Sequence, residues 1–251
     1  MNAEPAPTAA VLIIGDEILS GRTLDTNTNA IARFLGALGI DLKEVRVVGD
    51  VQDEIVAALN ALRTRYTYVF TTGGIGPTHD DITADAVAKA FGVGIDYHPE
   101  ALVILAARIK PENFNEMRKR MARIPFGADL VKNGVSAAPG FQIENVFVMA
   151  GVPDIMQAML EDIAPRLARG RPVETVTIAA AISEGTIAAA LAKLQSECDA
   201  VAIGSYPHIQ DGRYGVQLVA RGRDAAAVEK VALALEEIVR KAGAEPKRHS
   251  P

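Results

Sequence analysis

The stretch that decides the fold is Thr-Thr-Gly-Gly-Ile-Gly-Pro-Thr-His-Asp-Asp-Ile-Thr, residues 71–83. It follows an apolar run at residues 66–71 that predicts a buried strand, and apolar residues at helical spacing follow it at 84–91. A glycine-rich loop at a strand-to-helix turn presents backbone N–H groups to an anion. Asp80 and Asp81 add negative charge to the same loop. The combination predicts a site for a phosphorylated ligand that also binds carboxylates, through a metal ion or through N–H and O–H donors.

On both sides of this loop, predicted strands alternate with predicted helices. Apolar runs at residues 9–14, 42–48 and 66–71 predict three strands, and apolar stripes at helical spacing follow each of them. This order is typical of a parallel sheet with helices on both faces. Residues 146–149 predict a fourth strand, with a helix after it that runs to Ile163. The first part of the chain is therefore predicted to be an α/β domain with a mostly parallel sheet.

The carboxyl ends of these strands carry acidic residues. Glu17, Asp50 and Asp81 each follow a predicted strand closely. Because ligands bind beyond the carboxyl ends of parallel strands, we expect these acids to face one site. Carboxylates around a phosphate need compensation, which Mg²⁺ or a similar hard cation supplies. The alternative is that one acid recognises N–H donors of a pterin or purine ring.

The glycines of the loop, Gly73, Gly74 and Gly76, allow close backbone approach and positive φ angles. A tight turn without a ligand is the alternative interpretation for the glycines alone. The loop lacks the Gly-Lys-Ser/Thr ending of a P-loop, and residues 15–17 after the first strand do not form a dinucleotide fingerprint. Both common nucleotide-binding motifs are therefore disfavoured.

The rest of the chain is expected to be less regular up to residue 141 and then to contain a second domain. Asp53 is predicted to cap a helix, 98–110 and 113–124 are predicted helices, and 126–141 is predicted to be a loop. A boundary at 169–172 separates domains 1–170 and 171–251. The second domain is predicted to contain a strand at 173–182, a helix at 186–197, strands at 200–205 and 214–221, a helix at 224–242 and a disordered tail at 243–251.

Composition limits the classes of function. The 251 residues carry a net charge of −5, so a broad nucleic-acid-binding face is not expected, and the basic residues at 118–123 are interpreted as a solvated helix face. The single cysteine, Cys198, cannot form an internal disulfide. No signal peptide or membrane-spanning run is visible, so we expect a cytoplasmic protein.

Together the motifs resemble the MoaB/Mog molybdopterin-binding fold, and within it the CinA (competence/damage-inducible protein A) family. The pattern Gly-Gly-x-Gly-Pro-Thr-x-Asp-Asp-x-Thr in residues 73–83 is specific to that group. The segments that carry the resemblance over nearly the whole chain are 15–19, 25–27, 48–50, 71–83, 133–140, 151–153, 204–207 and 212–215. The resemblance implies a three-layer α/β/α sandwich for residues 1–170 and a small KH-like α/β domain for residues 171–251.

The resemblance also implies a set of functional positions. Asp50 and Asp81 are the predicted catalytic residues and candidate metal ligands. The predicted ligand- or phosphate-binding positions are Gly73, Gly74, Gly76, Pro77, Thr78, Asp80, Glu17, Asn27 and Gly151.

The Mog branch adenylylates molybdopterin, whereas CinA-type domains are associated with metal-dependent ADP-ribose pyrophosphatase activity. We therefore expect a pyrophosphatase that acts on ADP-ribose or a related nucleotide pyrophosphate with a divalent metal ion, Mg, Mn or Co. The alternatives are a non-catalytic molybdopterin- or nucleotide-binding module and a molybdopterin adenylyltransferase. The expected partner is a small nucleotide or pterin, in a homo-oligomer, with no nucleic acid and no membrane. The nicotinamide-nucleotide deamidase domain of full-length CinA is not matched, so deamidase activity is not expected from these residues.

Overall fold

The computed structural model describes residues 6–136, 138–210 and 213–249. The chain divides into two compact units, Met1–Gly170 and Arg171–Pro251, each with its own hydrophobic core. Among the described residues, no helix combines the length and apolar character needed to cross a bilayer.

A six-stranded sheet forms the centre of the first unit, in the order β2-β1-β3-β8-β7-β6. Its strands are β1 (Thr8–Ile14), β2 (Asp41–Val48), β3 (Tyr68–Thr72), β6 (Asp129–Val131), β7 (Gly140–Ile143) and β8 (Val146–Met149). The first four in the order, β2, β1, β3 and β8, pair in parallel, whereas β7 and β6 continue the sheet as antiparallel strands. The prediction of an α/β fold with a mostly parallel sheet is confirmed.

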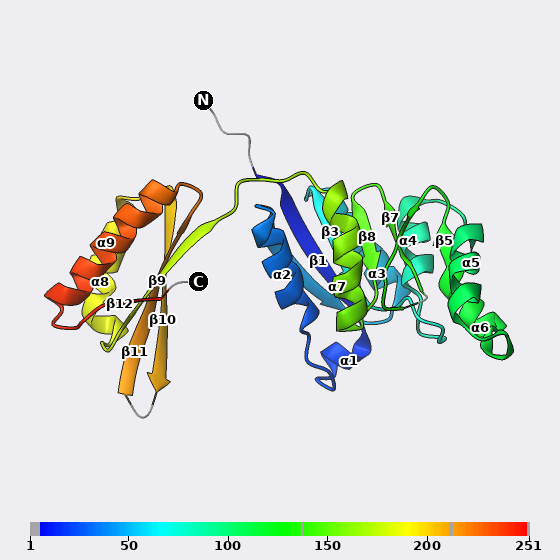
Figure 1. Cartoon of the computed structure of the whole chain (residues 1–251), viewed down its shortest axis with the longest axis horizontal. Helices are drawn as coiled ribbons and strands as arrows, with labels where there is room; N and C mark the ends of the chain where they lie inside the picture. Colours follow the sequence, from blue (N-terminus) through cyan, green and yellow to red (C-terminus); the bar gives the residue numbers. More distant parts are fainter. Residues whose placement is uncertain (1–5, 137, 211–212, 250–251) are drawn as a thin grey trace. The chain divides into compact units, whose positions relative to one another are not determined.

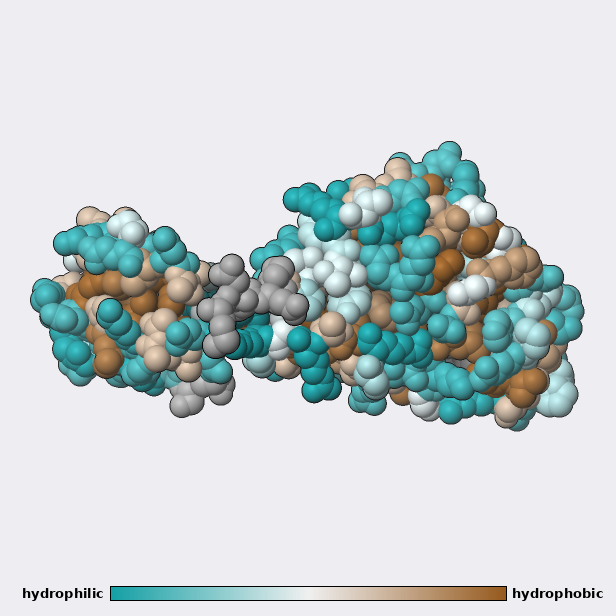
Figure 2. All heavy atoms as spheres, turned by 90° about the horizontal axis from the view of Figure 1, so that it is seen from above, coloured by the Kyte–Doolittle hydropathy of each residue, from teal (hydrophilic) through white to brown (hydrophobic). Residues whose placement is uncertain are grey.

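Helices cover both faces of this sheet and make three layers. The helices α2 (Asn27–Ala37) and α7 (Pro153–Ile163) lie on one face, and α3 (Gln52–Arg63) and α4 (Thr83–Phe91) on the other (Figure 1). Strands covered on both faces are apolar throughout, which explains the six consecutive buried residues of β1. Hydrophilic side chains dominate the surface of the first unit on the side shown in Figure 2, with smaller apolar areas among them.

The predicted helix at 98–110 is present as α5 (Pro99–Arg108), whereas the predicted helix at 113–124 is wrong. Residues 111–125 form a 3₁₀ turn (Pro111–Asn113), α6 (Glu116–Lys119), a second 3₁₀ turn (Arg120–Ala122) and β5 (Arg123–Pro125). Strand β5 pairs antiparallel with β4 (Ile95–Tyr97), and Arg123 makes a two-pronged ion pair with Asp85 of α4, at 2.7 and 2.9 Å. Both interactions join residues far apart in sequence, so local periodicity cannot reveal them. The predicted loop at 126–141 likewise contains β6 and the start of β7.

Two smaller predictions around the sheet edge also need correction. Asp53 does not cap α3: the capping position is Val51, and Asp53 lies in the first turn, where its carboxylate contacts Lys89 Nζ at 2.7 Å. Residues 15–27, whose polar composition predicts a loop after β1, begin with a short helix, α1 (Asp16–Leu19). A tertiary contact outweighs the capping preference of Asp53, and a backbone turn outweighs the loop preference of the residues after β1.

The second unit is a four-stranded antiparallel sheet with two helices on one face. Its order is β10-β11-β9-β12, and its elements are β9 (Glu174–Ala180), α8 (Glu184–Ser196), β10 (Val201–Gln210), β11 (Arg213–Gly222), α9 (Ala225–Lys241) and β12 (Lys247–His249). Asp224 caps α9 by accepting from the N–H groups of Ala226 and Ala227. The prediction of a small second α/β domain is confirmed.

The predicted disorder of the tail at 243–251 is wrong for the residues that form β12. Lys247, Arg248 and His249 pair with Ala179, Ile178 and Thr177 of β9. The guanidinium of Arg248 binds the carboxylates of Glu229 and Glu236 on α9. This strand is held by the edge of β9 and by Glu229 and Glu236, which lie nineteen and twelve positions before Arg248 in the sequence. Residues 250 and 251 lie outside the described part.

Candidate functional site

The predicted site residues lie at the carboxyl edge of the first sheet, where backbone hydrogen bonds continue between the loops. Gly15 N donates to Val48 O at 3.1 Å and Gly73 N donates to Met149 O at 3.2 Å. These bonds hold the loops after β1 and β3 against the ends of β2 and β8. The convergence expected from the strand order is therefore present.

The loop between β3 and α4 is organised by Asp81. Its carboxylate accepts hydrogen bonds from Gly76 N at 2.7 Å, from Thr78 N at 2.8 Å and from the Thr78 hydroxyl at 2.5 Å. The buried Thr83 fastens the start of the loop: its hydroxyl donates to Gly73 O at 2.9 Å and its N–H donates to Gly74 O at 3.0 Å. Because its oxygens already accept three bonds, Asp81 has little acceptor capacity left for other partners.

Contacts within the protein account for the glycines of this loop. Gly73 and Gly74 have φ angles of 101° and 67°. A Cβ atom on Gly73 would lie 2.1 Å from Ile14 O, and one on Gly74 would lie 2.2 Å from the Thr83 hydroxyl. A Cβ atom on Gly76 would lie 2.6 Å from Asp81 Oδ2. The tight turn thus explains all three glycines, and it leaves Gly74 N and Ile75 N without an acceptor among the described residues.

Pro77, Thr78 and Asp80 lie at the tip of the loop. Pro77 is half-buried, and Thr78 and Asp80 are exposed. The Thr78 hydroxyl also lies 2.5 Å from Asp80 Oδ1, so Asp80 and Asp81 share its single proton. This contact, with a hydrogen bond from the backbone of Asp80, lowers the pKa of the Asp80 carboxyl. The tip therefore presents an ionised carboxylate to solvent.

Asp50 is the electrostatic centre of the edge. Burial raises the pKa of its carboxyl, the hydrogen bond from Asp16 N at 3.0 Å opposes that shift, and the nearby charges of three acids raise it further. Those acids are Asp16, Glu17 and Asp80. Glu17, Asp50 and Asp80 thus follow three different strands, and the charges of Glu17 and Asp80 act on Asp50. Burial and these neighbouring charges both favour the neutral form of the Asp50 carboxyl, whereas a nearby cation would favour its ionised form.

A recess of about 70 Å³ lies beside this acidic group, and its lining includes Glu17, Asn27, Thr72, Gly73 and Gly151. Asn27 Nδ2 donates to Gly151 O at 2.7 Å. A Cβ atom on Gly151 would lie 3.3 Å from Gly73 Cα, so the loop after β8 packs on the glycine loop. Asn27 Oδ1 and the Thr72 hydroxyl are buried and have no hydrogen-bond partner in the described structure. Buried polar atoms are normally paired, so these two are candidates for contact with a ligand or water.

A second, smaller recess of about 20 Å³ lies on the other side of the loop, lined in part by Gly74, Gly76, Asp81, Arg120 and Arg123. Arg123 is neutralised by Asp85. Arg120 has no ion-pair partner among the residues that the structure describes, so it brings an uncompensated cation to the loop. Thr72 and Arg120 are not among the residues predicted for the site. Thr72 could have been predicted, because it ends a buried strand directly before the loop. Nothing in the local sequence indicates that Arg120 lies near the loop.

The described residues contain no group of three or more His, Cys, Asp or Glu side chains arranged to hold a metal ion. Asp50, Glu17 and Asp80 lie near one another, and Asp81 is hydrogen-bonded into its own loop. The edge can therefore supply one or two carboxylates to a cation, but it does not form an all-protein cage.

Comparison with known families agrees with this architecture. Residues 10–169 match the model of a family described as "Probable molybdopterin binding domain", and residues 172–247 match one described as "FAD synthase, middle domain". The first match covers more than half of the chain and includes every predicted site residue. The chain therefore belongs to the family of the probable molybdopterin binding domain.

Similar proteins and a similar solved structure define the fold of the first unit more closely. A protein of Sulfurisphaera tokodaii is 33% identical over 92% of this chain and 93% of its own length. Proteins of Saccharolobus islandicus are 37% identical, and the alignment spans 65% of this chain and 65% of their length. The crystal structure of CinA from Thermoplasma acidophilum, a protein described as of unknown function, is 33% identical with a TM-score of 0.61, over 64% of this chain and 98% of that one. The first unit is thus a CinA-like molybdopterin-binding fold.

Proposed function

We propose that the first unit is a metal-dependent hydrolase of nucleotide pyrophosphates of the ADP-ribose type. The observation that carries the proposal is the acidic group around Asp50, beside two unpaired loop N–H groups on one sheet edge. Unpaired N–H groups bind phosphate oxygens, and carboxylates bind hard cations. A pyrophosphate with its cation combines both requirements in one ligand.

The electrostatics support a cation that arrives with the substrate. Mg²⁺ is usually bound by one or two carboxylates together with substrate phosphates and waters, which fits an edge without a three-ligand group. In this proposal Asp50 would be the principal metal ligand, with Glu17 and Asp80 beside it. The bound ion would neutralise phosphate oxygens and lower the pKa of a water molecule.

The remaining residues of the site would bind the substrate and orient it. Gly74 N and Ile75 N would hold one phosphate group, and Arg120 would balance charge on the far side of the loop. Asp81 would act on catalysis by holding the loop in its binding shape, with a metal-ligand role as the second possibility. Asn27 and Thr72 would use their unpaired oxygens on the sugar or base.

A comparison of Asp50→Asn and Asp81→Asn with the wild type tests this function. AMP release from ADP-ribose and FAD is measured with Mg²⁺, Mn²⁺ and Co²⁺, and both variants should lose roughly 10²-fold or more of the activity. Asp53→Asn is the matched control, because Asp53 is an exposed acid just outside the site that pairs with Lys89. Absence of AMP release by the wild type with all three ions would refute the proposal.

A non-catalytic binding module is the second candidate, because Asp81 is already hydrogen-bonded within its loop. Calorimetry with ADP-ribose and with molybdopterin, each with and without metal, distinguishes the two. Binding without turnover would favour the module.

A further inference from the structure

The sheet of the second unit has one face that its own helices leave open. Helices α8 and α9 pack on the face that carries Ile178, Val216 and Leu218, all fully buried. Successive residues of a strand point to opposite faces, so their neighbours form the other face. Strand register places Tyr206, Gln217, Ala179 and Lys247 side by side in one row across that face.

Two ring side chains rest on this open face over glycines. A Cβ atom on Gly204 would lie 2.8 Å from Tyr206 Cε2, and one on Gly215 would lie 2.7 Å from His208 Nε2. A side chain at either glycine would displace the ring, so the glycines leave room for the rings to lie on the sheet. Tyr206 is nevertheless 56% exposed. His208 Nδ1 is buried and has no partner in the described structure.

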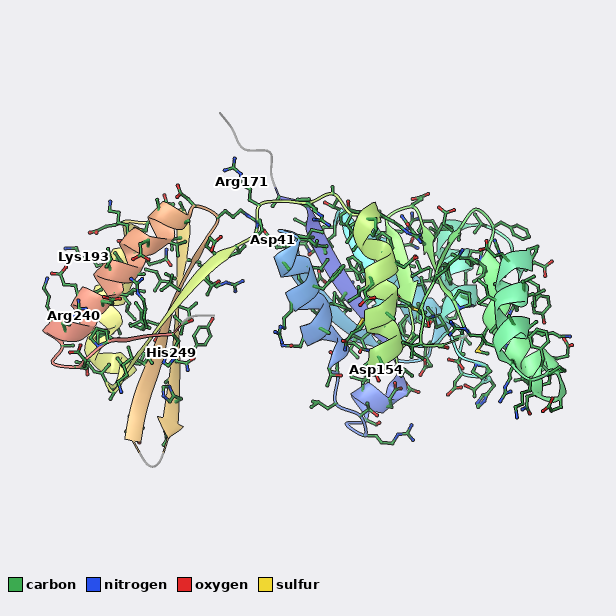
Figure 3. All side chains as sticks on the ribbon, in the orientation of Figure 1. Asp41, Asp154, Arg171, Lys193, Arg240 and His249 are labelled. Carbon is green, nitrogen blue, oxygen red and sulfur yellow. The ribbon has the colours of Figure 1, made fainter. Side chains whose placement is uncertain are left out.

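Positive charge gathers on the same face and is uncompensated. Lys247 on β12 and Arg221 on β11 belong to it by register, and neither has an ion-pair partner in residues 171–210 and 213–249; the ring of His249 lies on the same face. Arg248, between Lys247 and His249, points to the other side and binds Glu229 and Glu236 of α9. Figure 3 labels His249 on β12 and Arg240 on α9. Alternation along β12 therefore directs the ion-paired Arg248 to the helices and the unpaired Lys247 to the open face, together with His249.

A depression lies at one end of this sheet. It measures about 960 Å³, and its lining includes His208, Gly215, Lys247 and His249 of the open face, together with Tyr214, Ala180 and one acid, Glu245; Tyr206 is not among its lining residues. Small-molecule sites typically measure roughly 300–1,000 Å³. The depression is therefore large enough for a complete nucleotide.

We propose that this face of the second unit binds a nucleotide that carries two or more phosphates. The base stacks on the ring of Tyr206, which lies outside the depression, and on that of His208 in its lining, as bases stack on aromatic residues of open sheets. The phosphates lie against Lys247 and His249. Tyr206 is on β10 and Lys247 is on β12, three strands further across the sheet, so the two strands are about 14 Å apart at the usual strand spacing. That span selects a nucleoside diphosphate or a larger nucleotide over a free base or inorganic phosphate. The site is separate from the acidic edge of the first unit and does not depend on pyrophosphatase activity.

Calorimetric titration of the full chain with ADP tests the proposal. The first unit also has a candidate nucleotide site, so the titrations are made without metal and repeated in Asp50→Asn, which leaves the second unit unchanged. Tyr206→Ala and Lys247→Gln should each weaken the second-unit binding roughly tenfold or more, the scale of a lost stacking contact. Tyr206→Phe keeps the ring and should bind as the wild type does. Lys230→Gln, a change on α9 away from the face, is the matched charge control and should also bind normally.

NMR spectra of the histidine rings provide a readout that does not require the variants to be stable. Without metal, ADP should shift the resonances of His208 and His249 and leave that of His79 in the first unit unmoved. Adenosine and inorganic phosphate should each bind much more weakly than ADP. Unchanged ADP affinity in both Tyr206→Ala and Lys247→Gln would overturn the proposal. Binding of a short oligoadenylate without binding of ADP would also overturn it, in favour of single-stranded RNA. So would self-association of the chain, abolished by Tyr206→Ala, without ADP binding.

Discussion

Gly74 and Gly92 share the same backbone conformation but not the same surroundings. Both have φ of 67°, yet a Cβ atom on Gly74 would meet the Thr83 hydroxyl at 2.2 Å, whereas one on Gly92 would meet nothing within 4 Å. We predict that Gly92→Ala lowers the free energy of unfolding by about 1 kcal/mol, the cost of a left-handed conformation alone. Gly74→Ala should cost about 2 kcal/mol or more, because a steric contact is added. Urea denaturation of both variants measures the difference, and equal costs would contradict the packing explanation of the loop.

Thr83 joins the glycine loop to α4 through a buried hydroxyl. We predict that Thr83→Val lowers the free energy of unfolding by about 1–2 kcal/mol, because Gly73 O loses its donor in a buried place. Thr83→Ser keeps the hydroxyl and serves as the control, with a smaller loss expected from the missing methyl group. Thermal unfolding followed by circular dichroism measures both. A valine variant as stable as the wild type would show that the hydrogen bond to Gly73 O contributes nothing to stability.

At the residue scale, the sequence predicted which acids would meet and not what each of them does. Glu17 and Asp50 lie near each other because both follow parallel strands, and strand ends can be located from apolar runs. The use of Asp81 as an acceptor for its own loop depends on turn geometry, which the motif alone does not give. Arg120 reaches the loop only because residues 116–125 fold into short turns and a strand.

At the scale of elements, β12 depends on ion pairs to α9. Burial raises the pKa of Glu236, but hydrogen bonds from Arg248 and Arg240 outweigh it, so the pKa lies below its usual value. A carboxyl whose folded-state pKa is lowered stabilises the fold at neutral pH, and this contribution is lost as the pH falls from about 4.5 through the folded-state pKa. We therefore expect β12 to loosen in acid before the rest of the second unit.

Glu236→Gln should reproduce that loosening at neutral pH. Hydrogen exchange followed by mass spectrometry should show faster exchange in residues 247–249, while β10 and β11 stay protected. Glu237→Gln is the matched control, because Glu237 pairs with Lys241 on the helix surface and does not contact β12. Equal exchange in the two variants would show that the strand is held by its backbone bonds to β9 alone.

The elements that were predicted well are those with one dominant, local signal. Strands β1 and β8 and helix α7 follow continuous apolar runs or helical spacing, and their bounds match the prediction within one or two residues. Residues 113–124 also have a helix-like composition, but pairing of β5 with β4 and the Arg123–Asp85 ion pair decide their structure. Strand β12 is three polar residues long, and only its partners make it a strand.

At the scale of the whole molecule, the two units have cores that share no residues. We predict that residues 171–251 fold when expressed alone, because Ile178, Leu218 and Leu235 and their neighbours form a complete core between one sheet face and two helices. Dispersed amide resonances and a cooperative thermal transition would bear this out. A fragment without cooperative unfolding would show that the first unit supports the second.

Strand β8 lies between β3 and β7 in the first sheet, although 73 residues separate the end of β3 at Thr72 from the start of β8 at Val146. During synthesis, one edge of the buried strand β3 therefore has no hydrogen-bonding partner until nearly all of the first unit has left the ribosome. An apolar strand with unpaired N–H and C=O groups is a template for pairing with other chains. Helices α2 and α3 cover the faces of the sheet and leave that edge open, so the nascent chain depends on other protection of the edge, such as a chaperone, until β8 arrives.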